Sequence, residues 1–210
     1  YGVELKDVLV RVHALDLETL EETSFSNDEC EFGYRQSIFK GKAKGRYIIF
    51  GIEIILSKIP QVNTGYGDIQ RTLLENGITD PKAIDVFNAV CTIRQSKLPD
   101  PAELGNTGSF FKNPIVPNAI LEKIRVDYPE APHYPVSESH VKIPAGWLIE
   151  KSGWKGKVVG QTGNHAKQAL VIVNYGSATG KEIEQHAQNV IASIKENFGI
   201  ALEAEVNIIG

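Results

Sequence analysis

The stretch Gly105-Asn-Thr-Gly-Ser-Phe-Phe-Lys-Asn-Pro114 places two glycines, a hydroxyl, an ammonium and an amide around a pair of phenylalanines. Glycine adopts backbone conformations closed to other residues and lets a ligand approach the chain closely. One interpretation is therefore a loop that holds a polar ligand against Ser109. The alternative is an ordinary turn before an aromatic core anchor, Phe110 and Phe111, and these ten residues alone leave both open.

The residues after this stretch predict helices packed against a small sheet. Pro117–Asp127 and Pro144–Ser152 have apolar residues at helical spacing. Tyr128–Val136 carries three prolines and is expected to be an extended loop. Gln168–Asn174 is a continuous apolar run typical of a buried strand. We therefore expect this half of the chain to have an α+β fold.

The last thirty or so residues predict a long helix and a closing strand. Thr179-Gly-Lys-Glu182 is a capping-box pattern that begins the helix, and Gly199 is its natural stop. Ala201–Ile209 is expected to form a strand, so that strand, helix and strand would make a right-handed crossover. Glu203 and Glu205 would then point to the same face, either as a solvent-facing acidic stripe or with one carboxylate turned toward a site.

The first half predicts a small, mostly antiparallel sheet. Residues 3–15 alternate between apolar and polar, and Leu15–Glu22 reads as a second strand turning back. Arg46–Ser57, rich in β-branched and aromatic residues, is the clearest strand of this half. Asp68–Glu75 is expected to be a short helix, and a longer helix follows Pro81.

A domain boundary is expected at the proline-containing segment Arg94–Pro101. Two prolines there make a stiff linker in which a helix cannot continue. The chain of 210 residues is long enough for two small domains, and we assign residues 1–95 to one and 96–210 to the other. The expected fold is α+β throughout.

The composition excludes several classes of partner. A net charge of −4 gives no overall attraction to nucleic acid or to an anionic membrane. Cys30 and Cys91 form no CxxC pair and cannot make a disulfide framework, so a reducing, cytoplasmic compartment is expected. We find no apolar run long enough to span a membrane and no signal peptide. The chain begins without methionine, and we expect it to be a fragment.

Common catalytic motifs are absent from the sequence. There is no P-loop, no GxGxxG after a strand and no GxSxG, and the five histidines lack metal-ligand spacing. His165 and His186 are expected to be surface or structural residues. Cationic, hydroxyl and aromatic side chains in irregular segments would suit a phosphate-bearing ligand, although each one alone could be a solvated surface residue. These candidates are Arg35, Tyr66, Arg94, Lys97, Ser109, Lys112, Asn113 and Tyr134.

A series of short motifs carries a resemblance to a known family. In chain order they are Phe32–Phe39, Phe87–Val90, Ser96–Pro101, Gly105–Pro114, Ala145–Ile149, Gln168–Val171 and Leu202–Val206. Together they closely resemble the UDP-N-acetylenolpyruvoylglucosamine reductases, the MurB flavoenzymes of peptidoglycan synthesis, from the first residue to the last. The Tyr128–Pro135 loop is similar to that of the type I subclass, which closes a tyrosine over the substrate.

The resemblance implies an FAD-dependent, NADPH-driven reductase. In the family, NADPH reduces FAD, and flavin N5 then passes hydride to the enolpyruvyl ether of the UDP-sugar. Protonation of the neighbouring carbon gives UDP-N-acetylmuramate for the cell wall. Family chains are longer at the N-terminus, where the first FAD-binding subdomain lies. Residues 1–95 would be the rest of the FAD domain, and 96–210 the substrate domain.

The resemblance also assigns roles to residues. Ser109 matches the proton donor, and Arg35 and Glu205 match the groups that polarise the substrate carboxylate and stabilise the enol. The substrate-binding positions correspond to Tyr66, Lys97, Asn113, Tyr134 and Gln168, and Arg94 to a flavin contact. The chain departs from the family at Ala204, where relatives often have proline, and at Asn207, where arginine often follows. The second departure would weaken a flavin contact.

Two alternatives stay open from the sequence. The chain could be a UDP-sugar-binding module with no redox activity of its own, or another member of the FAD-linked oxidase-like architecture. Without the N-terminal part of the family we expect it to bind FAD poorly. The expected partner is a UDP-sugar alone, with neither nucleic acid nor membrane, and we expect a cytoplasmic monomer.

Overall fold

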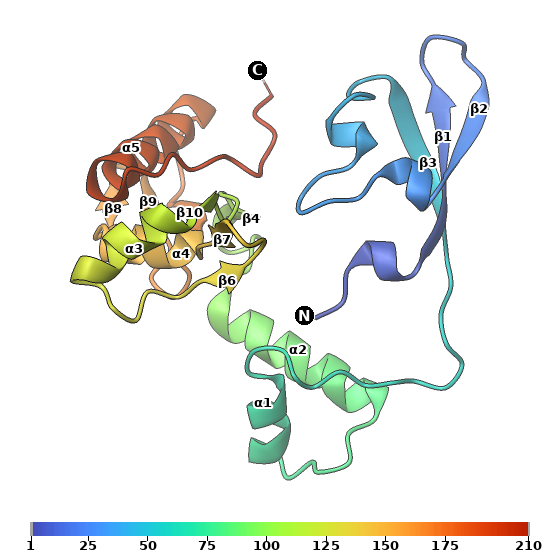
Figure 1. Cartoon of the computed structure of the whole chain (residues 1–210), viewed down its shortest axis with the longest axis horizontal. Coiled ribbons are helices and arrows are strands. Elements are labelled where there is room, and N and C mark those ends of the chain that lie inside the picture. The colour runs from blue at the N-terminus through green and yellow to red at the C-terminus, as the bar shows by residue number, and fades with distance from the viewer. Residues whose placement is uncertain (1, 210) are drawn as a thin grey trace. The chain divides into compact units, whose positions relative to one another are not determined.

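The structure is a computed structural model that describes residues 2–209 (Figure 1). The chain divides into two compact units, Tyr1–Ile93 and Arg94–Gly210. Every strand pair among the described residues is antiparallel. The predicted α+β class, with an antiparallel sheet region ahead of a second α+β region, is confirmed.

The first unit contains a three-stranded sheet in the order β2-β1-β3. Its strands are β1 (Leu9–Asp16), β2 (Glu22–Ser26) and β3 (Tyr47–Ile54), and the 3-10 turn η1 (Leu5–Asp7) precedes β1. The prediction of a strand from Leu15 to Glu22 was wrong. The backbone N–H of Leu20 donates to the carbonyl of Asp16 at 2.8 Å, which closes a tight turn, so the returning strand begins only at Glu22.

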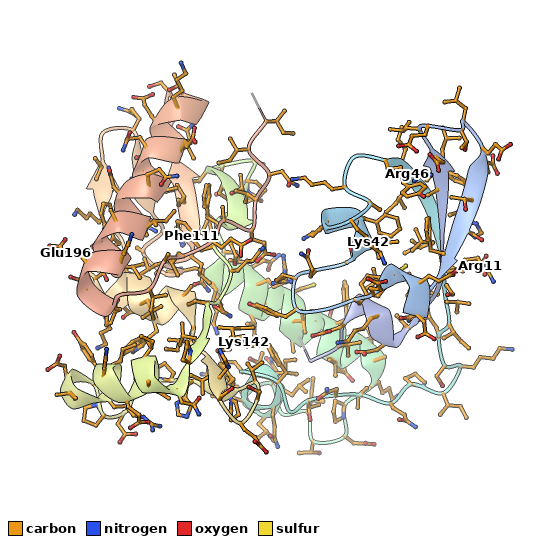
Figure 2. All side chains as sticks on the ribbon, turned by 45° about the horizontal axis from the view of Figure 1, so that its top comes forward. Arg11, Lys42, Arg46, Phe111, Lys142 and Glu196 are labelled. Atoms are coloured by element: carbon orange, nitrogen blue, oxygen red, sulfur yellow. The ribbon has the colours of Figure 1, made fainter. Side chains whose placement is uncertain are left out.

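The core of this sheet lies on one face. Leu9, Val12 and Cys30 are buried there and are covered by three phenylalanines and by the 3-10 turns η2 (Asp28–Cys30) and η3 (Ile38–Lys40). At the end of β1 the buried Asp16 accepts a hydrogen bond from Arg46 at 2.8 Å (Figure 2 labels Arg46). This bond lowers the pKa of Asp16, which keeps the carboxylate charged in its buried position.

Two helices complete the first unit. Ile69 and Leu73 of α1 (Ile69–Glu75) pack against Ala89 and Ile93 of α2 (Ala83–Lys97). The predicted helices are confirmed, but α2 continues through the residues that we expected to form a linker. Arg94 and Lys97 are therefore helical, not in a loop. The N–H of Leu98 still has a helical acceptor, the carbonyl of Arg94 at 2.8 Å, and only Pro99, which has no N–H, ends the pattern.

The second unit contains a four-stranded sheet in the order β4-β10-β9-β8. The strands are β4 (Gly105–Ser109), β8 (Val158–Val159), β9 (Thr162–Asn164) and β10 (Val171–Asn174). The long helix α5 (Gly180–Phe198) packs with β9 and β10. Its predicted limits are confirmed: Thr179 and Glu182 form the capping box, and Gly199 ends the helix with φ of 69°.

A smaller sheet extends the second unit, with the order β5-β7-β6. Its strands are β5 (Ile115–Pro117), β6 (Tyr134–Pro135) and β7 (His140–Lys142). The predicted helices near these strands are confirmed as α3 (Asn118–Asp127) and α4 (Ala145–Lys151). Tyr134 lies in a short strand and not in a continuous loop, because its backbone pairs with Lys142.

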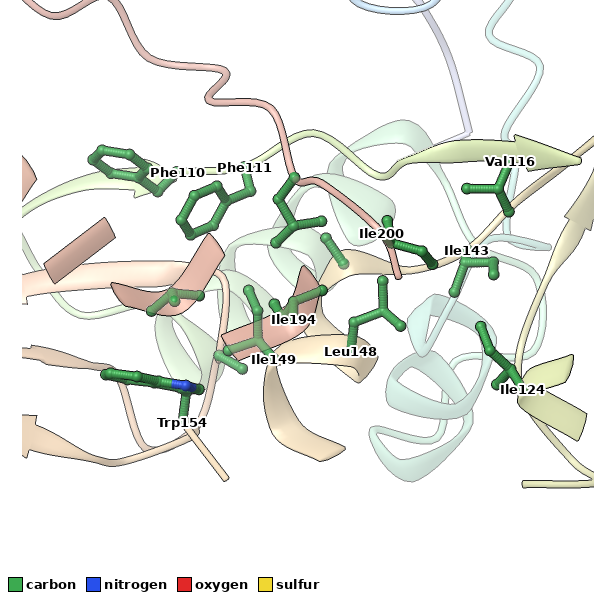
Figure 3. Close-up of a cluster of buried hydrophobic side chains, with 14 of the residues drawn as sticks. Phe110, Phe111, Val116, Ile124, Ile143, Leu148, Ile149, Trp154, Ile194 and Ile200 are labelled. Atoms are coloured by element: carbon green, nitrogen blue, oxygen red, sulfur yellow. The ribbon is translucent and has the colours of Figure 1, made fainter. Parts of the chain in front are cut away.

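One core holds the second unit together (Figure 3). Leu148 and Ile149 of α4, Ile194 of α5 and the pair Phe110–Phe111 are buried in it. Burying a side chain of this size stabilises the fold by roughly 1.5–3 kcal/mol. The sheet, α4 and α5 are therefore expected to form one cooperative block.

The predicted closing strand Ala201–Ile209 was wrong, and so was the right-handed crossover. In the described part of this segment, Ala204 forms a single bridge with Phe111. Lys112 N–H donates to the Glu203 carbonyl at 2.9 Å, and Glu205 N–H donates to the Phe110 carbonyl at 2.8 Å. The segment is held by these two bonds beside a chain that runs antiparallel to it, so no parallel strand pair is made.

Candidate functional site

The stretch Gly105–Pro114 begins as a strand. Our interpretation of it as a loop was wrong, because Gly105–Ser109 pairs with β10. The register shifts between the pair Val171–Ser109 and the pair Val173–Asn106, and Gly108 within the shift has φ of 72°. A residue with a side chain rarely adopts that backbone conformation, so the glycine permits the irregularity. Such bulges redirect side chains and are frequent beside active sites.

The two phenylalanines anchor this stretch. Phe110 and Phe111 are buried, with ring centroids 5.0 Å apart. The alternative interpretation, a core anchor, is thereby confirmed. Ser109 precedes the anchor and Lys112 follows it, and both are only half-buried. The buried phenylalanines therefore fix the positions of Ser109 and Lys112, the polar residues on either side of them.

Asn113 and Gln168 both lie at the first turn of α4. The carboxamide oxygen of Asn113 accepts a hydrogen bond from the backbone N–H of Ala145 at 2.8 Å. The carboxamide oxygen of Gln168 lies 3.6 Å from the position that a Cβ atom would occupy on Gly146. Two predicted substrate contacts that are far apart in sequence are thus brought to consecutive residues of one helix.

The turn that carries Gln168 is held from behind by the buried Asn164. Its side-chain N–H donates to the Ala169 carbonyl at 2.7 Å, and the His165 N–H donates to the Val171 carbonyl at 2.8 Å. Asn164 is fully buried, so these bonds are shielded from water. The Gln168 turn is consequently part of the rigid sheet and not a free loop.

The backbone of Glu205 is hydrogen-bonded to Phe110, the residue that follows Ser109. Phe110 donates its N–H to Leu170 and accepts the N–H of Glu205, at 2.9 and 2.8 Å. The side chain of Glu203 forms an ion pair with Lys112 and is largely exposed. The expectation of two glutamates on one regular strand was wrong, and of the two readings left open for this pair, Glu203 fits the solvent-facing one.

Tyr134 lies on the smaller sheet. Its ring is exposed, and the ammonium of Lys142 lies 5.8 Å from the ring centroid. Lys142 pairs in turn with Ile115, two residues after Asn113. The described residues therefore connect Tyr134 to the same polypeptide segment as Ser109 and Asn113.

The remaining predicted residues are divided between the units. Arg35 and Tyr66 belong to the first unit, and Arg94 and Lys97 belong to the second. Arg35 is at the tip of a narrow turn between Gly33 and Gln36 and has φ of 54°. A non-glycine residue in that left-handed conformation is uncommon, and such residues cluster at functional sites.

A cavity of about 690 Å³ lies in the second unit, next to the end of α2. Its volume is in the range of small-molecule sites. Of the predicted site residues, Arg94 lines it. Sequence reasoning did not assign the charged residues Asp100, Glu103 and Lys167 of the wall to a site, and it expected His165, which also lines the cavity, to be a surface or structural residue.

His165 is distinctive within this wall. Its Nδ1 atom is buried and has no hydrogen-bond partner among the described residues. Burial and the nearby Lys167 charge lower the pKa of His165, so its ring is neutral at pH 7. His186, by contrast, is fully buried, which agrees with the structural role expected for it.

The described residues contain no group of three or more histidine, cysteine, aspartate or glutamate side chains that could hold a metal ion. In the same residues, every helix is too short or too polar to cross a membrane.

Comparison with known proteins identifies the family. Residues 100–209, more than half of the chain, match the family model described as UDP-N-acetylenolpyruvoylglucosamine reductase, C-terminal domain. The chain belongs to this reductase family. The reductase of Flavobacterium johnsoniae is 53% identical over the whole chain, and that of Pseudomonas putida is 47% identical over 99% of it. The family resemblance stated from the sequence motifs is confirmed.

The chain spans only part of its relatives' length. It covers 62% of the Flavobacterium johnsoniae reductase and 61% of the Pseudomonas putida reductase. The crystal structure of the reductase (MurB) from Thermus caldophilus matches 96% of this chain and 53% of that chain, with a TM-score of 0.55 and 20% identity. That likeness supports the fold.

Proposed function

We propose that this chain provides the UDP-sugar-binding unit, and part of the catalytic machinery, of an FAD-dependent and NADPH-driven reductase. The reaction is the reduction of UDP-N-acetylglucosamine enolpyruvate to UDP-N-acetylmuramate in peptidoglycan synthesis. We assign residues 96–210 to substrate binding and residues 1–95 to the flavin-binding domain. The proposal rests on the segment Ser109–Asn113. The backbone of Glu205 is hydrogen-bonded to Phe110 within this segment, and the side chains of Asn113 and Gln168 both lie at the first turn of α4.

Ser109 is the proposed proton donor. A serine hydroxyl is a weak acid, so it requires a neighbouring group that stabilises the charge developing in the transition state. Glu205, whose backbone N–H donates to the carbonyl of Phe110, is the carboxylate that we propose for this role. The guanidinium of Arg35 would bind the substrate carboxylate in a bidentate manner and stabilise the enol form.

The proposed substrate-binding residues suit a nucleotide diphosphate. Asn113 and Gln168 offer amide groups at α4, and Lys97 offers an ammonium that attracts phosphate as a point charge. Tyr134 and Tyr66 add aromatic rings and hydroxyl groups, and both rings are more than half exposed. Neutral amides combined with a few cations are typical of sites that bind phosphates without relying on overall charge.

The wall of the cavity beside Arg94 gives no net attraction to the diphosphate of FAD. It contains two carboxylates, Asp100 and Glu103, and two cations, Arg94 and Lys167. When bound in a complete reductase, the flavin supplies hydride to the substrate. We assign its binding chiefly to the share of the reductase that this chain does not span, and Arg94 remains a proposed flavin contact.

The chain offers a direct test of substrate binding. Calorimetric titration of the 210-residue chain with UDP-N-acetylglucosamine should show saturable binding that Asn113→Asp weakens, because the added negative charge repels phosphate. An exposed substitution away from the site, Ser177→Ala, is the matched control. Absence of binding by the folded chain would contradict the proposed substrate domain.

The catalytic assignment is tested in a fusion of this chain with the part of the Flavobacterium johnsoniae reductase that the chain does not span. Ser109→Ala should leave flavin reduction by NADPH intact and slow flavin reoxidation by substrate by about 10²–10⁴-fold. Equal loss of both half-reactions would exclude Ser109 as the proton donor. The alternative function is a UDP-sugar-binding module without redox activity, and it predicts binding without any flavin absorbance in the purified chain.

A further inference from the structure

A buried histidine interrupts the apolar face of α5. The side chains buried in this helix are those of His186, Ala187, Val190 and Ile194. His186 lies three residues after Ile183 and four before Val190, so helical spacing alone would favour an apolar residue at its position. Burying a polar ring costs free energy unless its nitrogens are hydrogen-bonded, so this position requires polar partners.

Both ring nitrogens of His186 have partners on β9. Nε2 lies 2.8 Å from the carboxamide oxygen of Asn164, and Nδ1 lies 2.8 Å from the hydroxyl of Thr162. Both partner side chains are buried, and the ring of Trp154 packs edge-on against the imidazole at a centroid distance of 5.3 Å. Thr162, Asn164 and His186, the polar cluster, are therefore shielded from water, where hydrogen bonds are stronger.

His186 fixes the direction in which the amide of Asn164 faces. The side-chain N–H of Asn164 donates to the Ala169 carbonyl at 2.7 Å, so its oxygen accepts the Nε2–H of the imidazole. With the amide turned over, its oxygen would face the Ala169 carbonyl, and two buried acceptors would lie together. The imidazole therefore holds the amide in the orientation that binds Ala169.

The Ala169 carbonyl belongs to the turn between β9 and β10, which supports the proposed site. Gln168 precedes Ala169, and the carbonyl of the residue after Ala169 accepts the N–H of Phe110 at 2.9 Å. Phe110 follows Ser109 and accepts the N–H of Glu205 at 2.8 Å. The turn thus carries one proposed substrate contact and, through Phe110, supports the backbone of two proposed catalytic residues.

We propose that His186 is a positioning residue of the UDP-sugar site, because it orients Asn164 and so holds the turn that carries Gln168. For substrate binding this role depends on the proposed function, whereas the order of the turn depends only on the hydrogen bonds. Packing alone does not require the polar cluster, since apolar groups of similar shape can replace a buried polar pair at nearly no cost. The cluster instead specifies one conformation of the turn.

Amide exchange in the 210-residue chain tests whether His186 orders the turn. The N–H groups of Phe110 and Val171 both donate to carbonyls of this turn. His186→Leu, which puts an apolar side chain of similar size in place of the ring, should speed their exchange by about 10-fold in NMR measurements. His186→Gln retains a side-chain N–H near the position of Nε2 and should keep both rates within about twofold of the parent. Unchanged rates in His186→Leu, or equal acceleration in both variants, would overturn the inference.

Further variants break the same link at other points. His186→Asn is too short to reach Asn164, so it should act like His186→Leu, and it replaces that variant if the leucine protein does not fold. Asn164→Ala removes the N–H that binds Ala169 and should speed exchange at the same amides by about 10-fold. Combining it with either His186 variant should add nothing, because His186 acts through Asn164, and additive effects would contradict this route.

A matched control separates this effect from a general loss of stability. Ile194→Val trims a fully buried side chain of the same helix and lowers stability without touching the polar cluster. The Phe110 and Val171 amides should then change no more than the other amides of β4 and β10. A selective acceleration at the turn in this control would show that any damage to α5 loosens the turn, and His186 would have no specific role.

Calorimetric titration with UDP-N-acetylglucosamine tests the consequence for the site. His186→Leu and Asn164→Ala should weaken binding about 10-fold, because binding groups lose affinity when the residues that support them are loosened. His186→Gln should bind within about twofold of the parent, as should Ile194→Val. If the parent binds and His186→Leu binds equally well, His186 is not a positioning residue of the site. If the parent does not bind, the proposed function fails, and amide exchange still decides whether His186 orders the turn.

Discussion

The imidazole Nε2 of His186 lies 2.8 Å from the carboxamide oxygen of Asn164. Asn164 uses its side-chain N–H to bind the Ala169 carbonyl, so its oxygen accepts a hydrogen bond from the Nε2–H group of His186. The other ring nitrogen lies 2.8 Å from the hydroxyl of Thr162, which also donates to the Val159 carbonyl at 2.9 Å. Burial, followed by the charge of Lys157, lowers the pKa of His186. The ring is therefore neutral and holds the Gln168 turn through Asn164.

This arrangement predicts a pH dependence of stability. An unfolded histidine titrates near about 6.5, and the folded pKa of His186 lies below that value. The unfolded state therefore binds more protons, so the stability contributed by His186 is complete above pH 6.5 and decreases as the pH falls below it. Urea unfolding midpoints between pH 8 and pH 5 should show this decrease. His186→Gln should reduce it, and the remainder is expected from His165, whose pKa is also lowered. A variant of the more accessible His140, His140→Gln, is the control and should keep the slope.

Gly163 in β9 should not tolerate a side chain. A Cβ atom there would lie 2.9 Å from the carbonyl of Lys157 and 3.0 Å from the ring of Tyr175. Gly163→Ala should therefore destabilise the second unit by about 1–3 kcal/mol, measured by chemical unfolding. Gly180, the first residue of α5, has open space at the same position. Gly180→Ala should be neutral or stabilising by up to about 1 kcal/mol, and an equal loss in both variants would contradict the packing argument.

Phe111 should be essential to the second unit because its side chain fills the core beside the proposed site. Phe111→Ala removes a ring that is 2% exposed and should cost about 3–5 kcal/mol of unfolding free energy. Phe87 on α2 is 61% exposed, so Phe87→Ala should change stability by no more than about 0.5 kcal/mol. Thermal unfolding followed by circular dichroism compares the two, and similar losses would show that the assigned core is wrong.

Asn113 combines a structural and a proposed binding role, which two substitutions should separate. Asn113→Ala leaves the N–H of Ala145 without its acceptor and should cost about 1–3 kcal/mol as well as weakening UDP-sugar binding. Asn113→Asp keeps an oxygen for Ala145 but adds a negative charge. Its Tm should stay close to that of the parent chain while UDP affinity falls. If Asn113→Asp binds UDP as tightly as the parent, the residue does not contact phosphate.

The local sequence was sufficient where the signal lies within a few residues. The capping box of Thr179 and Glu182 and the stop at Gly199 predicted both ends of α5, because capping groups bind backbone atoms of their own helix. The β-branched and aromatic run Arg46–Ser57 predicted β3, which the structure forms from Tyr47 to Ile54. The family motifs also identified the reductase family before any geometry was known.

Pairing between distant segments could be settled only by the tertiary structure. Gly105–Ser109 is a strand because it pairs with β10. In the described part of Ala201–Ile209, Ala204 forms a single bridge with Phe111, and Glu203 and Glu205 each form one backbone hydrogen bond to the segment beside them. Asn113 and Gln168 likewise meet at α4. Local sequence patterns predicted the helices and the family of this protein, whereas the burial of Phe110 and Phe111 decided between the two interpretations of their segment. The positions of its polar groups depended on backbone partners far away in the chain, which no local pattern encodes.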